Sequence, residues 1–500
     1  MKKIAIFIFL IVTLTGCDSD ILNLTNPNMV TTQTFWKTEE DVLSGITATY
    51  SLMATTEQMW GNRGILIFNG RGDDHFLRND MQPVYQATSF TNTPDNTEVR
   101  NLFSVPYRMI FRANQVIEST PGVEGLGESE KAVYIGEAKF LRALCYFMLV
   151  TNWGDVPLRL TVPQSRDDYF VKQSSQAEVW QQIIADFKAA ADVLPLSYPS
   201  NFVGRATKGA ALAFLGKSYL YTGDWANVVS TLTPLTQTPY TYRLMDNFGD
   251  NFIKTTENNA ESIFEVQFQD ISGLGGSGHT SAQMIAPSEV RGWFQTYPTN
   301  KLFNEFQIEK TVDGELDPRM YATLVWDYEG ATFYNLPFSD FQTPFPQYIA
   351  RFKKYQNYDQ DTEYVGSAGS TGYSDNNERI MRYDYVLLML AEAHTMLGQL
   401  SEANNYLKPV RGRAHLDESK TDGYGQNEMM AEIRHQCMLE FVREGQRFYD
   451  LRRWGILKQE IMDSDKEGRE FFVEGKHDYF PIPQDEINAN PLIEQNPYWK

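Results

Sequence analysis

The chain has 500 residues, of which 42% are hydrophobic and 13% aromatic, a composition typical of a folded globular protein. Its 64 acidic and 44 basic residues give a formal net charge of −20 at pH 7. Because this charge repels phosphate groups, it argues against nucleic acids and anionic membrane surfaces as partners and leaves neutral or cationic ligands.

The first seventeen residues have the pattern of a bacterial lipoprotein signal. Lys2 and Lys3 precede an apolar run over residues 4–14, which leads into Leu14-Thr15-Gly16-Cys17. At a rise of about 1.5 Å per residue, this run is too short to cross a bilayer as a helix. Cleavage after residue 16 would leave Cys17 as the lipid-bearing N-terminus, and several acyl chains anchor a protein stably. We therefore expect residues 1–16 to be a signal peptide and Cys17 to be lipidated.

Two alternatives concern this terminus. In the first, the protein is secreted and Cys17 is incidental. In the second, Asp18 holds the lipoprotein at the inner membrane, as an Asp after the lipid-bearing Cys does in some Gram-negative bacteria. No later apolar run approaches the twenty residues that a membrane-spanning helix needs, so lipid is the only membrane attachment that we expect.

The segment over residues 60–85 surrounds Trp60 with charged and amide side chains. Weak recognition of sugars uses flat aromatic faces for the C–H surface of the ring and polar groups for the hydroxyls. This mixture makes the segment a candidate binding loop, although core packing remains an equal alternative for any one aromatic residue. The candidate contacts are Trp60, Arg71, Asp73, Asp74, Arg78 and Asn79.

Helical patterns dominate the chain and come in pairs. Residues 206–221 and 225–235 flank a turn at Gly223, and residues 385–397 and 401–410 form a second such pair. Leu215-Gly216-x-x-Tyr219 matches the core of the tetratricopeptide pattern, in which a small residue lets two helices approach. Residues 131–150 and 177–194 are further long helices. Since one hairpin cannot bury both of its faces, we expect a mainly α fold in which tetratricopeptide-like hairpins stack.

Residues 240–377 interrupt the helical patterns with a loop-rich, aromatic-rich insert. The insert is rich in Gly, Pro, Asn and Ser, and its aromatic residues include Trp293 and Tyr297. Loops of this kind on a rigid support often carry function. Trp293 and Tyr297 are therefore a second set of candidate sugar contacts.

The sequence offers no pattern for catalysis. It has no Gly-x-Ser-x-Gly elbow, phosphate-binding loop or dinucleotide fingerprint, and no two of its six His residues have the spacing of metal ligands. Cys145 and Cys437 lie in apolar helical patterns and are interpreted as buried, inert thiols. We expect no catalytic residue, no metal and no cofactor.

Residues 440–455 combine acidic and basic side chains at helical spacings. These spacings allow the neighbouring pairs Glu440–Arg443 and Glu444–Arg447. We interpret the segment as an ion-paired brace.

Five segments are informative when they are taken together. They are residues 21–50 with Phe35-Trp36-Lys37-Thr38, residues 136–143 continuing to 153–157, residues 382–393, residues 440–455, and residues 480–498. In this order they resemble the motifs of the SusD/RagB family of lipid-anchored, glycan-binding partners of outer-membrane importers. The resemblance runs nearly end to end.

The resemblance implies a single domain over residues 17–500, with a helical scaffold at about 21–235 and 378–460, the insert at about 240–377 and an extended tail at about 461–500. It implies a non-enzymatic, surface-exposed outer-membrane lipoprotein that captures oligosaccharides and passes them to a SusC-like TonB-dependent transporter. Two alternatives remain: the same transport role with peptide cargo, or an anchored glycoside hydrolase.

Overall fold

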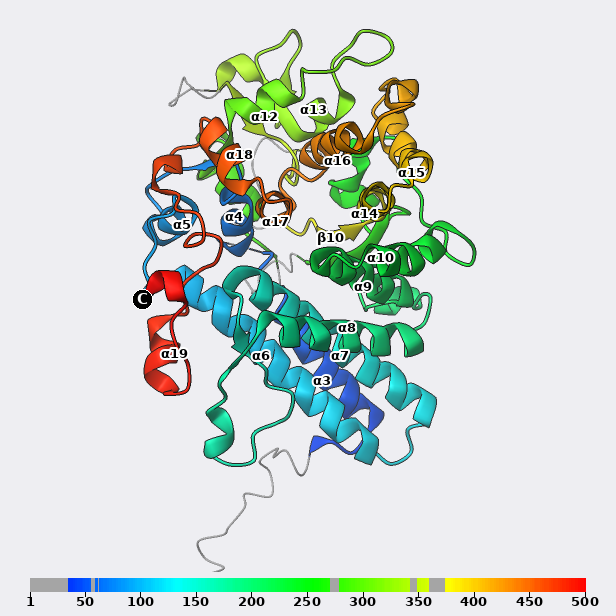
Figure 1. The fold of residues 1–500 in the computed structure, drawn as a ribbon, viewed down its shortest axis with the longest axis vertical. Helices are drawn as coiled ribbons and strands as arrows, with labels where there is room; N and C mark the ends of the chain where they lie inside the picture. The colour runs from blue at the N-terminus through cyan, green and yellow to red at the C-terminus, as the bar shows by residue number, and fades with distance from the viewer. Residues whose placement is uncertain (1–34, 55–58, 62, 270–277, 342–348, 359–373) are drawn as a thin grey trace, which may run out of the picture.

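The computed structural model describes residues 35–54, 59–61, 63–269, 278–341, 349–358 and 374–500. Helices make up most of the described chain, which confirms the predicted mainly α fold (Figure 1). The predicted signal peptide over residues 1–16 and the predicted lipidation site at Cys17 lie outside the described residues.

The hairpin predicted around Gly223 forms as α9 (Lys208–Thr222) and α10 (Trp225–Leu232). Gly223 ends α9 with a φ of +73°, a left-handed conformation that favours glycine. On the face between the helices, a Cβ on Gly216 would lie 2.3 Å from Cδ2 of Leu232. Gly216 therefore permits the close approach of the two helices, as the tetratricopeptide pattern predicts.

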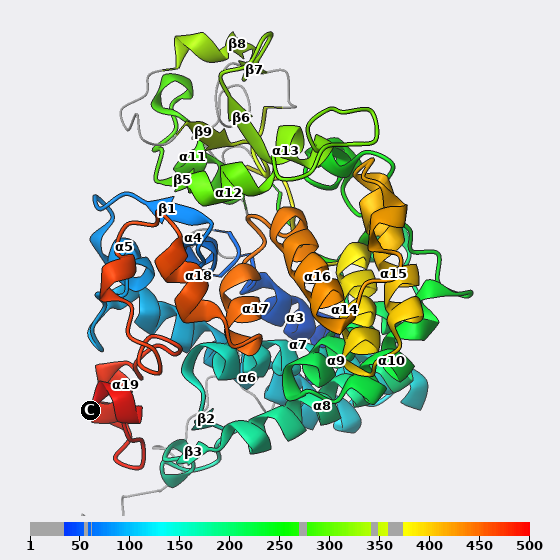
Figure 2. The same ribbon diagram turned by 45° about the horizontal axis from the view of Figure 1, so that its top comes forward.

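Successive long helices stack against one another and form the scaffold (Figures 1 and 2). Each helix covers an apolar face of the one before it, so that a single large core runs through the stack. The helices of the scaffold are α3 (Glu39–Ser51), α6 (Thr97–Ser119), α7 (Glu128–Trp153), α8 (Gln176–Val193), α9, α10, α14 (Tyr383–Met396), α15 (Leu400–Arg413) and α16 (Gln426–Glu440).

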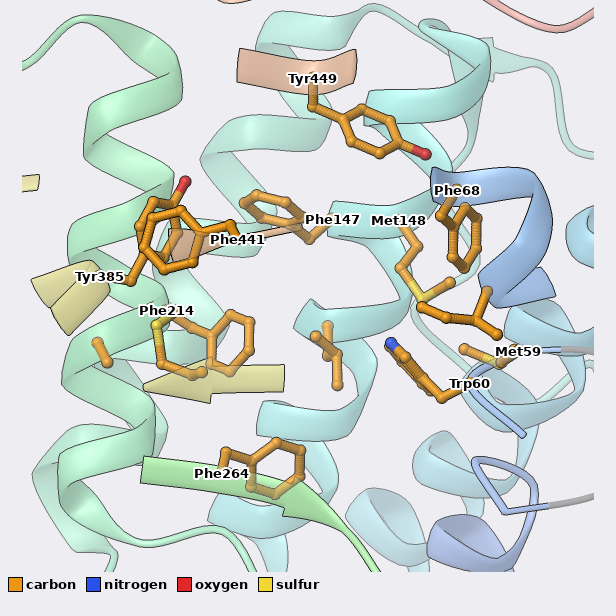
Figure 3. Close-up of a cluster of buried hydrophobic side chains, with 14 of the residues drawn as sticks. Met59, Trp60, Phe68, Phe147, Met148, Phe214, Phe264, Tyr385, Phe441 and Tyr449 are labelled. Atoms are coloured by element: carbon orange, nitrogen blue, oxygen red, sulfur yellow. The ribbon is translucent and has the colours of Figure 1, made fainter. Parts of the chain in front are cut away.

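Aromatic rings fill the centre of the stack (Figure 3). The ring of Phe140 in α7 meets those of Phe187, Phe214 and Phe264 at centroid distances of 5.5, 5.6 and 5.1 Å, all near edge-to-face. Cys145 and Cys437 are buried and unbridged, and burial raises the pKa of both thiols. Their predicted burial is confirmed.

Short paired strands and short helices, rather than loops alone, organise the insert. The strand pair β4 (Ser262–Val266) and β10 (Glu378–Arg382) is antiparallel and joins the insert to α14. Two further antiparallel pairs lie within the insert: β6 (Leu324–Trp326) with β9 (Ala350–Phe352), and β7 (Thr332–Phe333) with β8 (Leu336–Pro337). The insert strand β5 (Thr296–Pro298) pairs with β1 (His75–Leu77), near the start of the described chain. The pair β2 (Val156–Pro157) with β3 (Gln173–Ser174) lies outside the insert, between α7 and α8. The short helices of the insert are α11 (Ser281–Ile285), α12 (Asn300–Glu305) and α13 (Pro318–Thr323).

Shorter helices complete the described chain near its two ends. They are α4 (Arg63–Gly70) and α5 (Gln82–Thr88), and then α17 (Arg447–Arg453), α18 (Leu457–Asp463) and α19 (Gln484–Ala489). The predicted extended tail thus contains a short helix, α19, within irregular backbone. In the part of the chain that the structure describes, no helix combines the length and apolar character of a membrane span.

The predicted brace over residues 440–455 is ion-paired, but its partners differ from those predicted. Helix α16 ends at Glu440, and Arg443 has a φ of +68°, so residues 440–447 do not follow one helix. Among the described residues, neither the Glu440–Arg443 pair nor the Glu444–Arg447 pair forms. Glu440 instead pairs with Arg319 at 2.8 Å, and Glu444 pairs with Lys354 at 2.7 Å.

Candidate functional site

The pairing of β1 with β5 unites the two segments that the sequence singled out separately. Phe76 lies opposite Tyr297 in this antiparallel pair. Figure 2 shows strands β1 and β5 next to each other. Just beyond β1, the backbone N–H of Arg78 donates to the carbonyl of Gln295 at 2.9 Å. The Arg78 guanidinium also donates to the carbonyl of Trp293 at 3.1 Å. The two candidate segments therefore meet at one edge of a two-stranded ribbon.

Four residues at this edge form what we call the Trp293 surface: Arg78, Asn79, Asp80 and Trp293. The Trp293 side chain is 45% exposed, although large aromatic residues are usually buried. Asn79 and Asp80 are also exposed. Arg78 and Asp80 form an ion pair at 3.0 Å. The surface thus offers a broad aromatic side chain beside hydrogen-bond donors and acceptors.

The backbone on both sides of Trp293 is held tightly against α11. The backbone N–H of Trp293 donates to Gln283 at 2.7 Å, and that of Phe294 donates to Ala286 at 3.1 Å. At Gly292, an ideal Cβ would lie 1.9 Å from the carbonyl oxygen of Ala286, so the loop requires glycine there. Trp293 is therefore presented on a fixed loop, which lowers the entropy that a ligand must overcome.

Asp73 lies in the interior. Its carboxylate pairs with Arg447 at 2.7 Å and with Lys301 at 2.8 Å. Burial alone would raise the pKa of Asp73, but the two cations outweigh burial and hold the pKa well below its ordinary value. Asp73 therefore joins α12 and α17 to the segment before β1.

Arg71 and Asp74 are buried as well. The Arg71 guanidinium lies 3.8 Å from the ring centroid of Phe448 and 4.0 Å from that of Phe480, and it donates to the carbonyl of His477 at 2.8 Å. Burial lowers the pKa of Arg71 to about 9. Asp74 pairs with His75 at 3.0 Å. The Arg71 contacts attach the early segment to the C-terminal part of the chain.

The aromatic candidates Trp60 and Tyr297 also point inward. Figure 3 shows Trp60 beside Met59, Phe68 and Met148. Trp60 lines a small pocket of about 70 Å³. The Tyr297 ring packs on Phe76 and Phe294.

The structure therefore brings Arg78, Asn79 and Trp293 together at the surface, whereas it buries the other five predicted contacts. Because those five side chains are buried, they contact other parts of the protein and are not accessible to a ligand at the surface. Sequence reasoning missed Asp80, although its charge, opposite to that of Arg78 two positions earlier, was available as a signal. Within the described ranges, no group of His, Cys, Asp and Glu side chains has the arrangement of a metal site.

Two family models match the chain in succession. The model described as "Starch-binding associating with outer membrane" matches residues 20–220, and the model described as "SusD family" matches residues 260–499. Together they cover most of the scaffold, most of the insert and the C-terminal segment, and leave residues 221–259 unmatched. The order of the matches agrees with the resemblance seen in the sequence.

Related proteins match over nearly the whole chain. SusD-like protein P25 of Formosa agariphila is 25% identical over 99% of this chain and 98% of its own length. A SusD superfamily protein from Bacteroides vulgatus, known from a crystal structure, is 35% identical over 93% of this chain and 100% of its own, with a TM-score of 0.85. A structure described as a laminarin-binding SusD-like protein is 27% identical over 92% of this chain and 99% of its own, with a TM-score of 0.77. The fold, the two family models and the 35% identical relative together establish that this chain belongs to the SusD family.

Proposed function

We propose that the protein is a lipid-anchored glycan-binding protein of the outer membrane that captures oligosaccharides and passes them to a SusC-like TonB-dependent transporter. The observation that carries this proposal is the Trp293 surface. A half-exposed tryptophan on a fixed loop, next to Arg78, Asn79 and Asp80, has the chemistry that a sugar requires.

Each part of the Trp293 surface has a role in this proposal. The indole of Trp293 covers the C–H face of one sugar ring. The Arg78 guanidinium, already oriented by Asp80 and by the Trp293 carbonyl, donates to sugar hydroxyls, and the Asn79 amide donates or accepts. Binding requires no bond to break, and the relatives with printed functions are described as binding proteins.

Replacing Trp293 by alanine tests the binding surface. We expect Trp293→Ala to weaken binding of the preferred oligosaccharide by roughly 1–3 kcal/mol, because the apolar stacking area is lost. Calorimetric titration of a panel of neutral hexasaccharides measures the effect. Tyr169→Ala is the matched control, since that tyrosine is 54% exposed and ends a short 3-10 helix outside the Trp293 surface. Equal affinities for wild type and Trp293→Ala would reject this surface.

The same panel separates the proposal from its alternatives. New reducing ends after incubation with protein would identify a glycoside hydrolase. Selective retention of cationic peptides instead of glycans would identify peptide cargo, which the net charge of −20 would favour.

Membrane anchoring and transfer to the transporter need a separate test. The signal-like residues 1–16 and Cys17 support anchoring. We expect Cys17→Ala to abolish lipid labelling and release the protein from the membrane fraction. Copurification of the wild-type protein with a large TonB-dependent barrel would support transfer, and its absence after mild crosslinking would contradict it.

A further inference from the structure

A second cleft, which we call the Tyr240 cleft, lies on the scaffold away from the Trp293 surface. It has a volume of about 500 Å³ and shares no residue with the Trp293 surface. Three segments line it: residues 196–207 before α9, residues 239–242 after α10, and residues 258–265 leading into β4. Figure 2 shows α9 and α10 on the opposite side of the molecule from β1 and β5.

Two stacked tyrosine rings, Tyr240 and Tyr242, line the Tyr240 cleft, and a third ring, Tyr383, packs behind them. Tyr242 stacks on Tyr240 with a centroid distance of 5.9 Å and an interplanar angle of 13°, and its ring also stacks with that of Tyr383 at 6.2 Å and 26°. Among the described aromatic rings, only Tyr242 stacks on Tyr240. Tyr240, which is only half-buried and lines the cleft, therefore lies at the end of the stack.

Glycine at position 209 fixes the orientation of this stack. A Cβ on Gly209 would lie 2.1 Å from the hydroxyl oxygen of Tyr242. The Tyr242 side chain therefore reaches the backbone of α9 only because Gly209 has no side chain. The stack is therefore built into the scaffold and does not depend on a loose loop.

The charges in the Tyr240 cleft are already neutralised. Its charged lining residues are Arg205 and Glu265. Arg205 donates to Glu137 at 3.0 Å, and Glu265 pairs with Arg379 at 3.3 Å. The polar groups that remain for a ligand are hydroxyls and amides, from Thr207, Thr241 and Asn258 among others. A charged ligand would meet no unpaired counter-ion among these residues.

We infer that the Tyr240 cleft is a second binding site for neutral oligosaccharides. An aromatic face, hydroxyls, amides and internally balanced charge match a sugar, which is uncharged, rich in hydroxyls and apolar on its C–H faces. The inference rests on the proposed glycan-binding function but concerns different residues. Two sites on one chain would hold a long glycan at two points and raise its apparent affinity.

Calorimetric stoichiometry tests the inference. The mature protein, purified in detergent, is titrated with laminarihexaose, cellohexaose, mannohexaose and xylohexaose. We expect two molecules of the preferred hexasaccharide per wild-type chain and one per chain of Tyr240→Ala, whose second site is weakened at least tenfold. Gly209→Ala should have the same effect because it displaces Tyr242, and Tyr240→Trp should retain both sites. Tyr169→Ala is the control, and thermal melting confirms that each variant folds.

The outcomes separate this inference from the proposed function. One outcome is a single binding site that is lost in Trp293→Ala and unchanged in Tyr240→Ala. This outcome would overturn the inference about the Tyr240 cleft and would support binding at the Trp293 surface. A site that survives in Trp293→Ala and disappears in Tyr240→Ala supports the cleft. If no hexasaccharide binds to the wild-type protein, both are overturned.

Discussion

Asp73 illustrates how an acidic residue in a candidate binding segment can belong to the interior. Its carboxylate is fully buried between Arg447 and Lys301. We expect Asp73→Asn to lower the free energy of unfolding by about 3 kcal/mol, because two cations lose their counter-charge in a buried setting. Urea unfolding measures the effect. Asp80→Asn, at an exposed ion pair, should change the free energy of unfolding by less than about 1 kcal/mol.

Glu378 makes the stability of the protein depend on pH. Burial raises the pKa of this carboxyl to about 7, and Ser281 donates a hydrogen bond to it at 3.2 Å. Between about pH 4.5 and 7 the folded state holds this proton and the unfolded state releases it, so the contribution of Glu378 to stability falls as the pH rises. We expect Glu378→Gln to remove this component, worth about 3 kcal/mol across the interval. Unfolding curves of both proteins at pH 4.5 and pH 7.5 give the difference. If wild type and Glu378→Gln differ in free energy of unfolding by the same amount at both pH values, Glu378 is not the source of this pH dependence.

The site residues show what a sequence reveals at this scale. Aromatic and polar residues close together in the chain identified the segment that contains Arg78 and Asn79. The sequence did not reveal which of its side chains point outward, because that depends on distant partners: Arg447 lies 374 positions from Asp73. Solvent exposure is a property of the folded molecule, and local composition carries little information about it.

At the scale of elements, the α9–α10 hairpin depends on the absence of a side chain at Gly216. We expect Gly216→Ala to lower the free energy of unfolding by about 1–3 kcal/mol, because the new methyl group would collide with Leu232. Chemical unfolding measures the loss. Gly122→Ala is the matched control, since nothing lies within 4 Å of a Cβ placed there.

A double variant checks the cause of that loss. Leu232→Ala alone leaves a cavity, whereas in combination with Gly216→Ala it gives space to the new methyl group. The combined loss should be smaller than the sum of the two single losses. Strict additivity would mean that the two residues do not interact.

The helical hairpins were predictable because their signals are local. Apolar periodicity, a glycine turn and a small residue at the helix contact all occur within thirty residues around Gly216 and Gly223. The pairs predicted after Glu440 were wrong because the assumed helix ends at that residue. The strand pairs of the insert were not predicted either, since strands of two to five residues leave little periodicity to detect.

At the scale of the whole molecule, buried ion pairs connect the insert to the scaffold. Glu440 at the end of α16 pairs with Arg319 in α13 and with Arg413 at the end of α15. Arg382 in β10 pairs with Glu261 and with Glu444, each at 2.7 Å. These ion pairs therefore join the insert to the helical stack. Separating the two parts would leave buried charges unpaired and would lower the stability of the fold.

We expect Glu440→Gln to lower the free energy of unfolding by about 3–5 kcal/mol, because buried arginines lose their partner. The loss should be nearly the same at low and high salt, since buried pairs are screened little. Urea unfolding at two sodium chloride concentrations measures both points. Glu474→Gln is the control, because its pair with Lys458 is exposed and should contribute less than about 1 kcal/mol. A small, salt-dependent loss in Glu440→Gln would show that the buried pairs do not hold the parts together.

The ribbon that places Trp293 beside Arg78 joins backbone positions 220 residues apart. Closing so long a loop costs conformational entropy, which is recovered only after the intervening helices have packed. A polypeptide that is truncated, or cut and separated, between β1 and β5 therefore lacks this ribbon altogether. Truncated chains would then not bind oligosaccharides at this surface and would not compete with intact chains for them.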